Sequence, residues 1–167
     1  MTNSRLKGYY SLDPPVSTDL ADHPSPLLVV PESPKKFREF VEFFAYCFKR
    51  EFHFDFVPFE ASQRPGSPGY MPYEVYLFHE TAHDLMEADK PTKHRCIGVC
   101  GFRWTEWTDV PPSWSCQWVW FHPYFRGRGY LSKAWPQFQE KYGKFHIQEP
   151  VSPAMQVFLR KRGHEQP

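Results

Sequence analysis

A glycine-rich segment between an expected strand and an expected helix carries the clearest chemical signal in the sequence. Residues 121–132 are Phe-His-Pro-Tyr-Phe-Arg-Gly-Arg-Gly-Tyr-Leu-Ser. Gly127 and Gly129 let the backbone approach a ligand closely, and the amides of the first helical turn have no partner within the helix. These amides, the helix dipole and the side chains of Arg126 and Arg128 all suit a negatively charged group. The segment therefore predicts an anion-binding loop.

Two familiar phosphate-binding loops do not fit this segment. A P-loop ends in Gly-Lys followed by Ser or Thr, and that ending is missing here. The glycines also lack the spacing of the dinucleotide-binding fold. A simpler interpretation is a tight turn between a strand and a helix with two solvated arginines, and the residues alone leave both interpretations open.

The segment resembles the acyl-CoA-binding motif of the GNAT superfamily of N-acetyltransferases. That motif has Arg or Gln, two residues, Gly, one residue and then Gly or Ala, after a strand that ends in a hydrophobic residue, any residue and Pro. The matching positions are Arg126, Gly127, Arg128, Gly129 and Tyr130, whereas Leu131 stands where the family prefers Gly or Ala. The resemblance covers residues 94–167, including a last helix with a terminal Gly. It implies an α/β (α+β) fold, with a central mixed, mostly antiparallel sheet flanked by helices.

The resemblance also implies acetyl-CoA as cosubstrate. The backbone amides from Gly127 to Leu131 would bind its pyrophosphate, and the strand near Phe121 would pair with the pantetheine arm where two parallel strands splay apart. The expected cofactor-binding residues are Phe121, Arg126, Gly127, Arg128, Gly129, Tyr130, Leu131 and Ser132. Residues 121–167 hold eight Lys and Arg against three Glu, which suits a ligand with several phosphates. The acceptor would be an amine of a small molecule, a protein or an aminoacyl-tRNA.

Catalytic residues are less clearly marked. Acyl transfer from a thioester to an amine needs a deprotonated nucleophile, an oxyanion donor and a proton for the leaving thiolate. Many members of the family supply that proton from a Tyr four residues before the terminal Gly, where this chain has Leu159. Glu106, near the end of an expected central strand, is the candidate general base, with Asp109 in the following turn. The alternatives are an exposed hairpin carboxylate at Glu106 and a non-catalytic acyl-CoA-binding module.

Residues 79–83 carry a second candidate motif, His-Glu-Thr-Ala-His. On a helix, the two histidines of H-E-x-x-H lie one turn apart and bind zinc while the Glu acts as a base. Apolar residues between 73 and 88 share one face if this segment is helical. In the acetyltransferase interpretation the same segment is a strand followed by an acidic loop. A zinc metallohydrolase, with Glu87 or Glu106 as third ligand, is thus an alternative function, and the leading interpretation assigns no metal ligand.

The cysteines have a simpler interpretation as core residues. Cys96 and Cys100 are expected on one face of a strand, with Cys116 on the neighbouring strand. These three thiols and His94 do not have the spacing of a zinc knuckle or ribbon. Because Cys packs as a small hydrophobic residue, buried free thiols are expected.

The tryptophans allow two interpretations. Strand alternation places Trp114, Trp118 and Trp120 on one face of the sheet. Such a face could stack nucleic-acid bases, but a sheet core or a pocket wall needs the same residues. We therefore expect core packing.

The elements divide the chain into a tail or arm over residues 1–24 and a single domain over residues 25–167. A helix is expected to about Phe52, with Ser33 as N-cap and Pro34 at the first helical position. The near-alternating phenylalanines from Phe52 to Phe59 indicate a strand or an aromatic lid. The other expected elements are strands at 25–30, 94–107, 114–121 and 145–147, a strand or helix at 73–80, and helices at 130–142 and 152–162.

Composition limits the class of protein. With 167 residues, one domain can form a core without disulfide or metal staples. A formal net charge of +1 excludes a general polyanion-coating protein. No run of 18 apolar residues is present, so no membrane association is expected, and the N-terminus does not resemble a signal peptide. Four cysteines in such a chain indicate reduced thiols and a cytoplasmic location.

Overall fold

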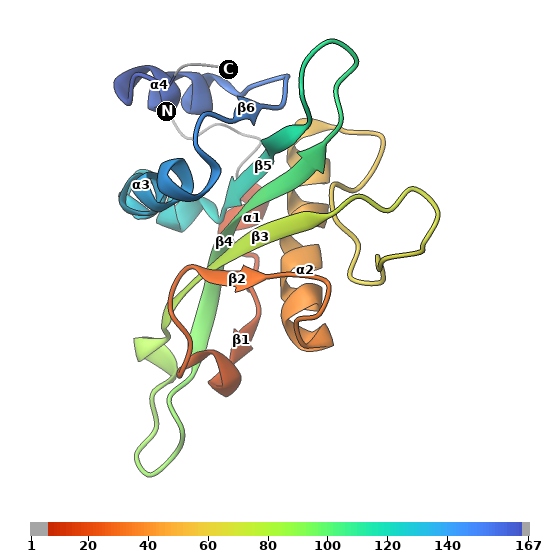
Figure 1. Cartoon of the computed structure of the whole chain (residues 1–167). Helices are drawn as coiled ribbons and strands as arrows, with labels where there is room; N and C mark the ends of the chain where they lie inside the picture. The colour runs from red at the N-terminus through yellow and green to blue at the C-terminus, as the bar shows by residue number, and fades with distance from the viewer. Residues whose placement is uncertain (1–6, 165–167) are drawn as a thin grey trace.

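The computed structural model describes residues 7–164, and a six-stranded sheet lies at its centre (Figure 1). The strands are β1 (Val16–Ser17), β2 (Leu27–Val29), β3 (Tyr73–Thr81), β4 (His94–Thr105), β5 (Ser113–Phe121) and β6 (His146–Ile147). Their order is β2-β3-β4-β5-β6, and β1 pairs with β4 beside this path. The pairs are antiparallel except for β5 with β6, which are parallel. The expected mixed, mostly antiparallel sheet is confirmed.

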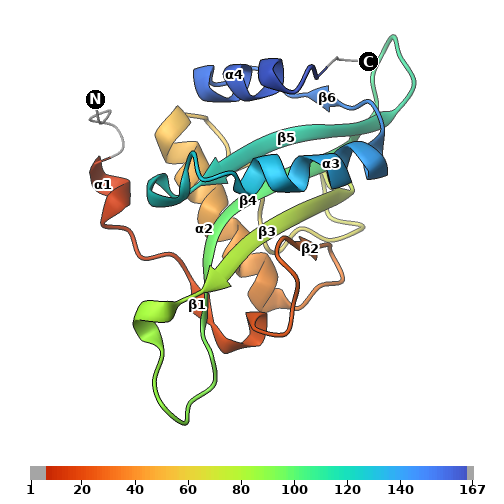
Figure 2. The ribbon, with the colours of Figure 1, turned by 90° about the vertical axis from the view of Figure 1, so that its left-hand side faces the viewer.

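Helices cover both faces of this sheet. They are α1 (Lys7–Tyr10), α2 (Lys35–Phe52), α3 (Tyr130–Tyr142) and α4 (Pro153–Lys161), with 3-10 turns η2 (Thr18–Leu20), η3 (His83–Leu85) and η4 (Pro123–Phe125). Figures 1 and 2 show α2 on one face of the sheet and α3 on the other. Within residues 7–164, none of the helices combines the length and the apolar character needed to cross a membrane.

The sheet separates two hydrophobic cores. On one face, Val41 and Phe44 of α2 pack in a fully buried cluster that includes Trp120 of β5. On the other face, Trp135 and Phe138 of α3 pack in a second cluster that α4 helps to cover. Burial of these side chains is the main force that holds the helices against the sheet.

Helix α2 begins one residue later than expected, and the hydroxyl of Ser33 does not cap it. Its N-cap is Pro34, and the Ser33 hydroxyl instead accepts a hydrogen bond from the Val30 amide at 2.9 Å. The helix ends at Phe52, and its C-cap His53 has a left-handed conformation with φ of 57°. The phenylalanines after this point form no strand, because the chain turns at residues 53–56.

The helices near the C-terminus follow the expected pattern. Helix α3 spans the expected residues and contains Pro136 in its second turn. Helix α4 begins at the N-cap Ser152, whose hydroxyl accepts a hydrogen bond from the Met155 amide at 3.2 Å. Strand β6 precedes α4 along the chain, so it fixes where α4 starts beside the sheet.

A β-bulge in β4 overturns the expectation for the cysteines. Phe78 pairs with Gly98 while His79 pairs with Cys96, which leaves Ile97 as an extra residue. A bulge reverses side-chain alternation beyond it. Cys96 therefore lies in the first core and Cys100 in the second, on opposite faces of the sheet.

A second bulge overturns the expectation for the tryptophans. Strand β5 has an extra residue, Gln117, where its register with β4 shifts. Trp118 and Trp120 lie in the first core, whereas Trp114 packs against the second. The three rings consequently cannot form one stacking platform.

The N-terminal segment is more than a tail. Val16 pairs with Arg95 of β4, and Leu20 is fully buried in the first core. The ring of Tyr9 meets that of Trp120 edge to face at 5.6 Å. Of the expected tail or arm over residues 1–24, residues 7–24 thus form part of the domain, and residues 1–6 lie outside the described residues.

Candidate functional site

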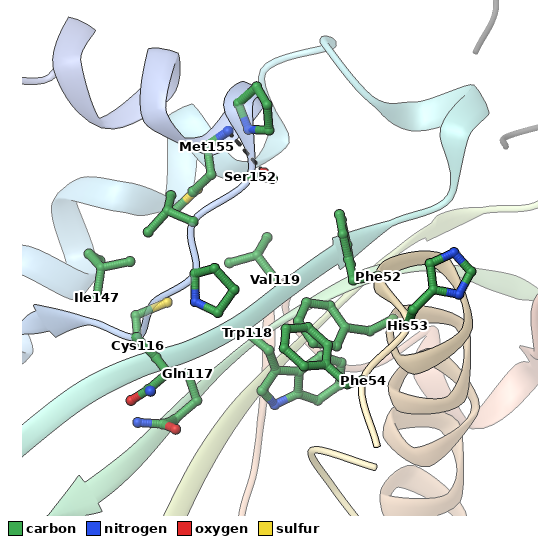
Figure 3. A pocket seen from close by; sticks show the side chains of 15 residues that line it. Phe52, His53, Phe54, Cys116, Gln117, Trp118, Val119, Ile147, Ser152 and Met155 are labelled. Atoms are coloured by element: carbon green, nitrogen blue, oxygen red, sulfur yellow. Dashed lines mark hydrogen bonds between the residues drawn. The ribbon is translucent and has the colours of Figure 1, made fainter. Parts of the chain in front are cut away.

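A groove runs along one edge of β5 toward the start of α3. It consists of two cavities of about 560 and 330 Å³. They share the lining residues Phe52, Val119, Ser152, Pro153 and Met155, so the two cavities adjoin each other along β5. Figure 3 shows the smaller cavity, with Phe52 at the end of α2 on one side and Met155 of α4 on the other.

The groove exists because β5 and β6 separate. Their parallel pairing consists of Ser115 with His146 and Cys116 with Ile147, followed by a 2.8 Å hydrogen bond from the Gln148 amide to the Cys116 carbonyl. The chain then leaves the sheet toward α4. This separation leaves an edge of β5 facing a cavity.

The backbone of β5 directs polar groups into this space. The His122 amide donates to the Ile97 carbonyl of β4 at 2.9 Å. Because alternate residues of an antiparallel strand point their backbone groups to opposite sides, those of Val119 and Phe121 point away from β4, toward the groove. The Phe121 carbonyl already accepts a 2.7 Å hydrogen bond from Nε of Arg126. Val119 is the residue whose amide and carbonyl face the shared part of the groove.

The start of α3 lines the larger cavity with backbone amides. Gly129 is its N-cap, with φ of 87°, and it provides no side-chain cap. The first helical bond of the turn runs from the Lys133 amide to the Gly129 carbonyl at 2.9 Å. The amides of Tyr130, Leu131 and Ser132 therefore have no partner within the helix, and all three residues line the cavity.

Arg126 lines the larger cavity and also has a structural role that was not expected. Its Nη1 and Nη2 atoms bind the two carboxylate oxygens of Glu51 at 3.0 and 2.9 Å. Trp120 Nε1 donates to the same carboxylate at 2.6 Å, and Glu51 is only 6% exposed. The guanidinium thus holds the loop to the end of α2, and these contacts use three of its five N–H groups. Sequence reasoning missed Glu51, which lies 75 residues before Arg126.

Arg128 and Tyr130 shape the loop from its other side. The Arg128 guanidinium lies 4.1 Å from the centre of the Tyr124 ring. The Tyr130 hydroxyl donates a hydrogen bond to Glu80 of β3. Burial is the larger cause and the hydrogen bond to Glu80 the second, and together they raise the pKa of Tyr130 to about 12. Tyr130 therefore ties α3 to the sheet, whereas Arg128 lies exposed beside the cavity.

The structure does not bring the expected general base to the groove. Glu106 and Asp109 lie exposed in the hairpin between β4 and β5, and neither lines either cavity. Leu159 of α4 packs against the second core. Glu106 lies outside the groove because β4 ends at Thr105, before this residue, and the chain then turns into the hairpin.

His53 is the groove residue best suited to proton transfer. It caps α2 at the mouth of the smaller cavity and is exposed (Figure 3). Imidazole is the side chain that most readily exchanges protons near neutral pH. Sequence reasoning had no signal for His53, because its place depends on where β5 and β6 separate.

The segment His-Glu-Thr-Ala-His does not form the helix that a zinc site would need. His79 lies in β3 and His83 in η3. His79 is 4% exposed, and its Nδ1 atom is 2.9 Å from Nδ1 of His94. Its Nε2 donates to the Pro24 carbonyl at 2.9 Å. Within residues 7–164, no group of three or more His, Cys, Asp or Glu side chains is arranged to hold a metal ion.

The four cysteines are buried free thiols, as expected. The sulfur atoms of Cys100 and Cys116 are 3.8 Å apart across the two strands. Burial raises the pKa of Cys96 to about 12 and that of Cys100 well above the usual range. Cys116 also lines the smaller cavity.

Comparisons with known proteins add no family to this geometry. No family model matches the chain, and no curated protein matches it closely enough to be counted as a relative.

Proposed function

We propose that the protein is an acetyl-CoA-dependent N-acetyltransferase that acts on an amine. The observation that carries this proposal is a groove along an unpaired stretch of β5 that leads to the uncapped start of a helix. Few ligands combine an anion with a long, narrow, amide-bearing arm, and CoA thioesters are such ligands. The resemblance of residues 121–132 to the GNAT motif supports the same conclusion.

In this proposal the two ends of the ligand bind to different groups. The pyrophosphate accepts hydrogen bonds from the amides of Tyr130, Leu131 and Ser132, where the helix dipole favours negative charge. Arg128 lies exposed beside them and adds a positive charge. The pantetheine arm runs along β5 as a substitute for a strand, with its thioester near Val119.

The transfer step then needs three groups. The amine attacks the thioester carbonyl, a C–N bond forms, the C–S bond breaks, and the products are an amide and CoA thiol. The Val119 amide points toward the groove and can donate to the oxyanion. His53 accepts the proton of the amine, and the thiolate takes its proton from solvent or from the protonated imidazole.

A pair of glycine substitutions tests the binding site. Gly129 and Gly143 both have positive φ, 87° and 65°, and a Cβ on either would meet no atom within 4 Å. Both substitutions strain the backbone, and Gly143→Val does so more, because its ψ of -135° lies in a region that is essentially restricted to glycine whereas Gly129 is left-handed helical. Gly129 lies in the proposed site and Gly143 at the other end of α3, so Gly143→Val is a stringent control for strain.

Thermal unfolding with CoA and acetyl-CoA measures the effect. A ligand at 100 times its Kd adds about 2.7 kcal/mol, which raises the midpoint by roughly 5 to 10 °C in a chain of this length. We expect this rise in the wild type and in Gly143→Val, and its loss in Gly129→Val. A rise that survives in Gly129→Val, or no rise in the wild type, would overturn the proposal.

A second candidate is a non-catalytic acyl-CoA-binding module. It is favoured by Leu159 at the position where the resemblance places a Tyr, and by the distance of Glu106 from the groove. Such a module binds acetyl-CoA with no release of CoA thiol when a panel of amines is added. Thiol release with any amine decides for the enzyme.

A further inference from the structure

We propose that the smaller cavity is an acyl chamber, and that the preferred cosubstrate carries a linear apolar acyl chain several carbons longer than acetyl. This inference rests on the proposed function, because it assigns a place in the same groove to the acyl group beyond the thioester. The chamber is defined as the cavity of about 330 Å³ between the end of α2, the β5–β6 junction and the start of α4.

The position of the chamber is set by the direction of the groove. The larger cavity contains the loop and the start of α3, and it extends along β5 from Phe121 to Val119. The chamber continues from Val119 to Trp118, Gln117 and Cys116, up to the point where β6 joins β5. A thioester near Val119 thus directs its acyl group into the chamber and away from the phosphates.

The chamber has an apolar lining. Its aromatic and aliphatic members are Phe48, Phe52, Phe54, Trp118, Val119, Ile147, Val151 and Met155. The rings of Phe48 and Phe54 stack at 5.1 Å, and Phe48 meets Trp118 at 5.8 Å, so these rings form a continuous wall. Figure 3 shows Phe54 and Trp118 on this side of the chamber. Apolar chains gain free energy from burial against such a wall.

The polar groups of the chamber do not make it a site for an ammonium ion. Among the described residues that line it, none is Asp, Glu, Lys or Arg. The Ser152 hydroxyl accepts from the Met155 amide, the Gln117 amide donates to Ser115, and the Gln148 amide donates to the Glu149 carbonyl. His53, the proposed base, also lines the chamber and is exposed, so the amine would reach it from solvent. The apolar remainder of the chamber, which offers an ammonium ion no carboxylate, fits the acyl group better than the acceptor.

The size of the chamber separates acetyl from longer chains. A volume of about 330 Å³ is what roughly ten water molecules occupy in the liquid. The acetyl group adds a single methyl beyond the thioester carbonyl and would leave most of this volume empty. Each further methylene buried there is expected to tighten binding roughly fourfold, until the chamber is filled.

A series of CoA thioesters tests the inference. The dissociation constants of CoA and of its acetyl, butyryl, hexanoyl and octanoyl thioesters are measured by calorimetry with the full chain. The expected result is similar binding of CoA and acetyl-CoA, then a fall in Kd of roughly tenfold or more for each two carbons up to an optimum. Thiol release with an amine panel should show the same order in kcat/KM.

Two matched substitutions locate the effect. Val151 lines the chamber but not the larger cavity, whereas Val157 of α4 is 46% exposed and lines neither cavity. Val151→Trp should abolish the gain from longer chains, and Val157→Trp should retain it. Circular dichroism and the response to free CoA report whether Val151→Trp still folds. A further variant, Met155→Ala, enlarges the chamber and should move the optimum to longer acyl chains.

Each outcome has one meaning. A constant Kd across the series, with CoA bound, overturns the acyl chamber and leaves the acetyltransferase proposal standing. A chain-length gain that a folded Val151→Trp protein retains also overturns the chamber. If neither CoA nor any thioester binds the wild type, the proposed function itself is wrong.

Discussion

The ion pair between the buried carboxylate of Glu51 and Arg126 should be a main support of the loop that we propose to bind phosphate. Substitution Glu51→Gln preserves the volume of the side chain but replaces one carboxylate oxygen with an amide NH₂. That group faces Arg126 and Trp120, which can only donate, so at least one charge-assisted hydrogen bond is lost. We expect this change to destabilise the protein and to loosen the loop.

The expected loss can be worked from the geometry. A hydrogen bond to a charged group contributes about 1.5 to 3 kcal/mol, and loss of one partner of a fully buried pair costs about 3 to 5 kcal/mol. The Arg126 side chain is 32% exposed, so water offsets part of that penalty. We therefore expect about 2 to 3 kcal/mol, which lowers the melting temperature by about 4 to 12 °C.

Urea and thermal unfolding of matched variants provide the assay. Glu39→Gln is the control, because Glu39 lies on the same helix, its side chain is 51% exposed and it pairs with Lys35 at 3.5 Å. Such a surface pair contributes less than about 1 kcal/mol. A double-mutant cycle with Arg126→Met should give a coupling energy of about 1 to 3 kcal/mol. If Glu51→Gln is no more destabilising than Glu39→Gln, the reasoning is refuted.

Two further predictions concern histidines. Burial lowers the pKa of His79 in the folded protein, so on acidification the unfolded chain binds a proton at a higher pH than the folded chain does. The free energy of unfolding should therefore fall as the pH drops below about 6.5, by up to about 1.4 kcal/mol per pH unit from this group. Urea unfolding at pH 7.5 and 5.5 should show a smaller fall in His79→Gln, and an equal fall would contradict the role of burial at this site. His53→Asn, which tolerates the left-handed conformation and cannot accept the proton, should lower kcat by about 10²- to 10⁴-fold and leave the Kd for acetyl-CoA unchanged. An unchanged kcat would mean that His53 is not the base.

The parts of the fold that depend on local pattern could be predicted from the sequence. The periodic apolar residues of α2 and α3 indicated their extents to within a residue or two, and the expected last helix at 152–162 agrees with α4 to within one residue at each end. The glycines at 127 and 129 marked the turn before α3, since both have positive φ. Each of these features is encoded within a few neighbouring residues.

The features that depend on distant residues could not be predicted. The extra residues Ile97 and Gln117 reverse the side-chain alternation and thereby place Cys96 and Trp114 on unexpected faces. Nothing in the local sequence marks them, because a bulge is set by packing against the neighbouring strand. The contact of Arg126 with Glu51 likewise joins positions 75 residues apart.

The unpaired stretch of β5 also has a consequence for self-association. An open strand edge normally invites pairing with a second polypeptide, which leads to aggregation or domain swapping. Here the edge at Val119 lies between Phe52 at the end of α2 and Met155 of α4, so it is recessed. Phe52 and Met155 thus stand beside this edge, which hinders its pairing with a second polypeptide strand.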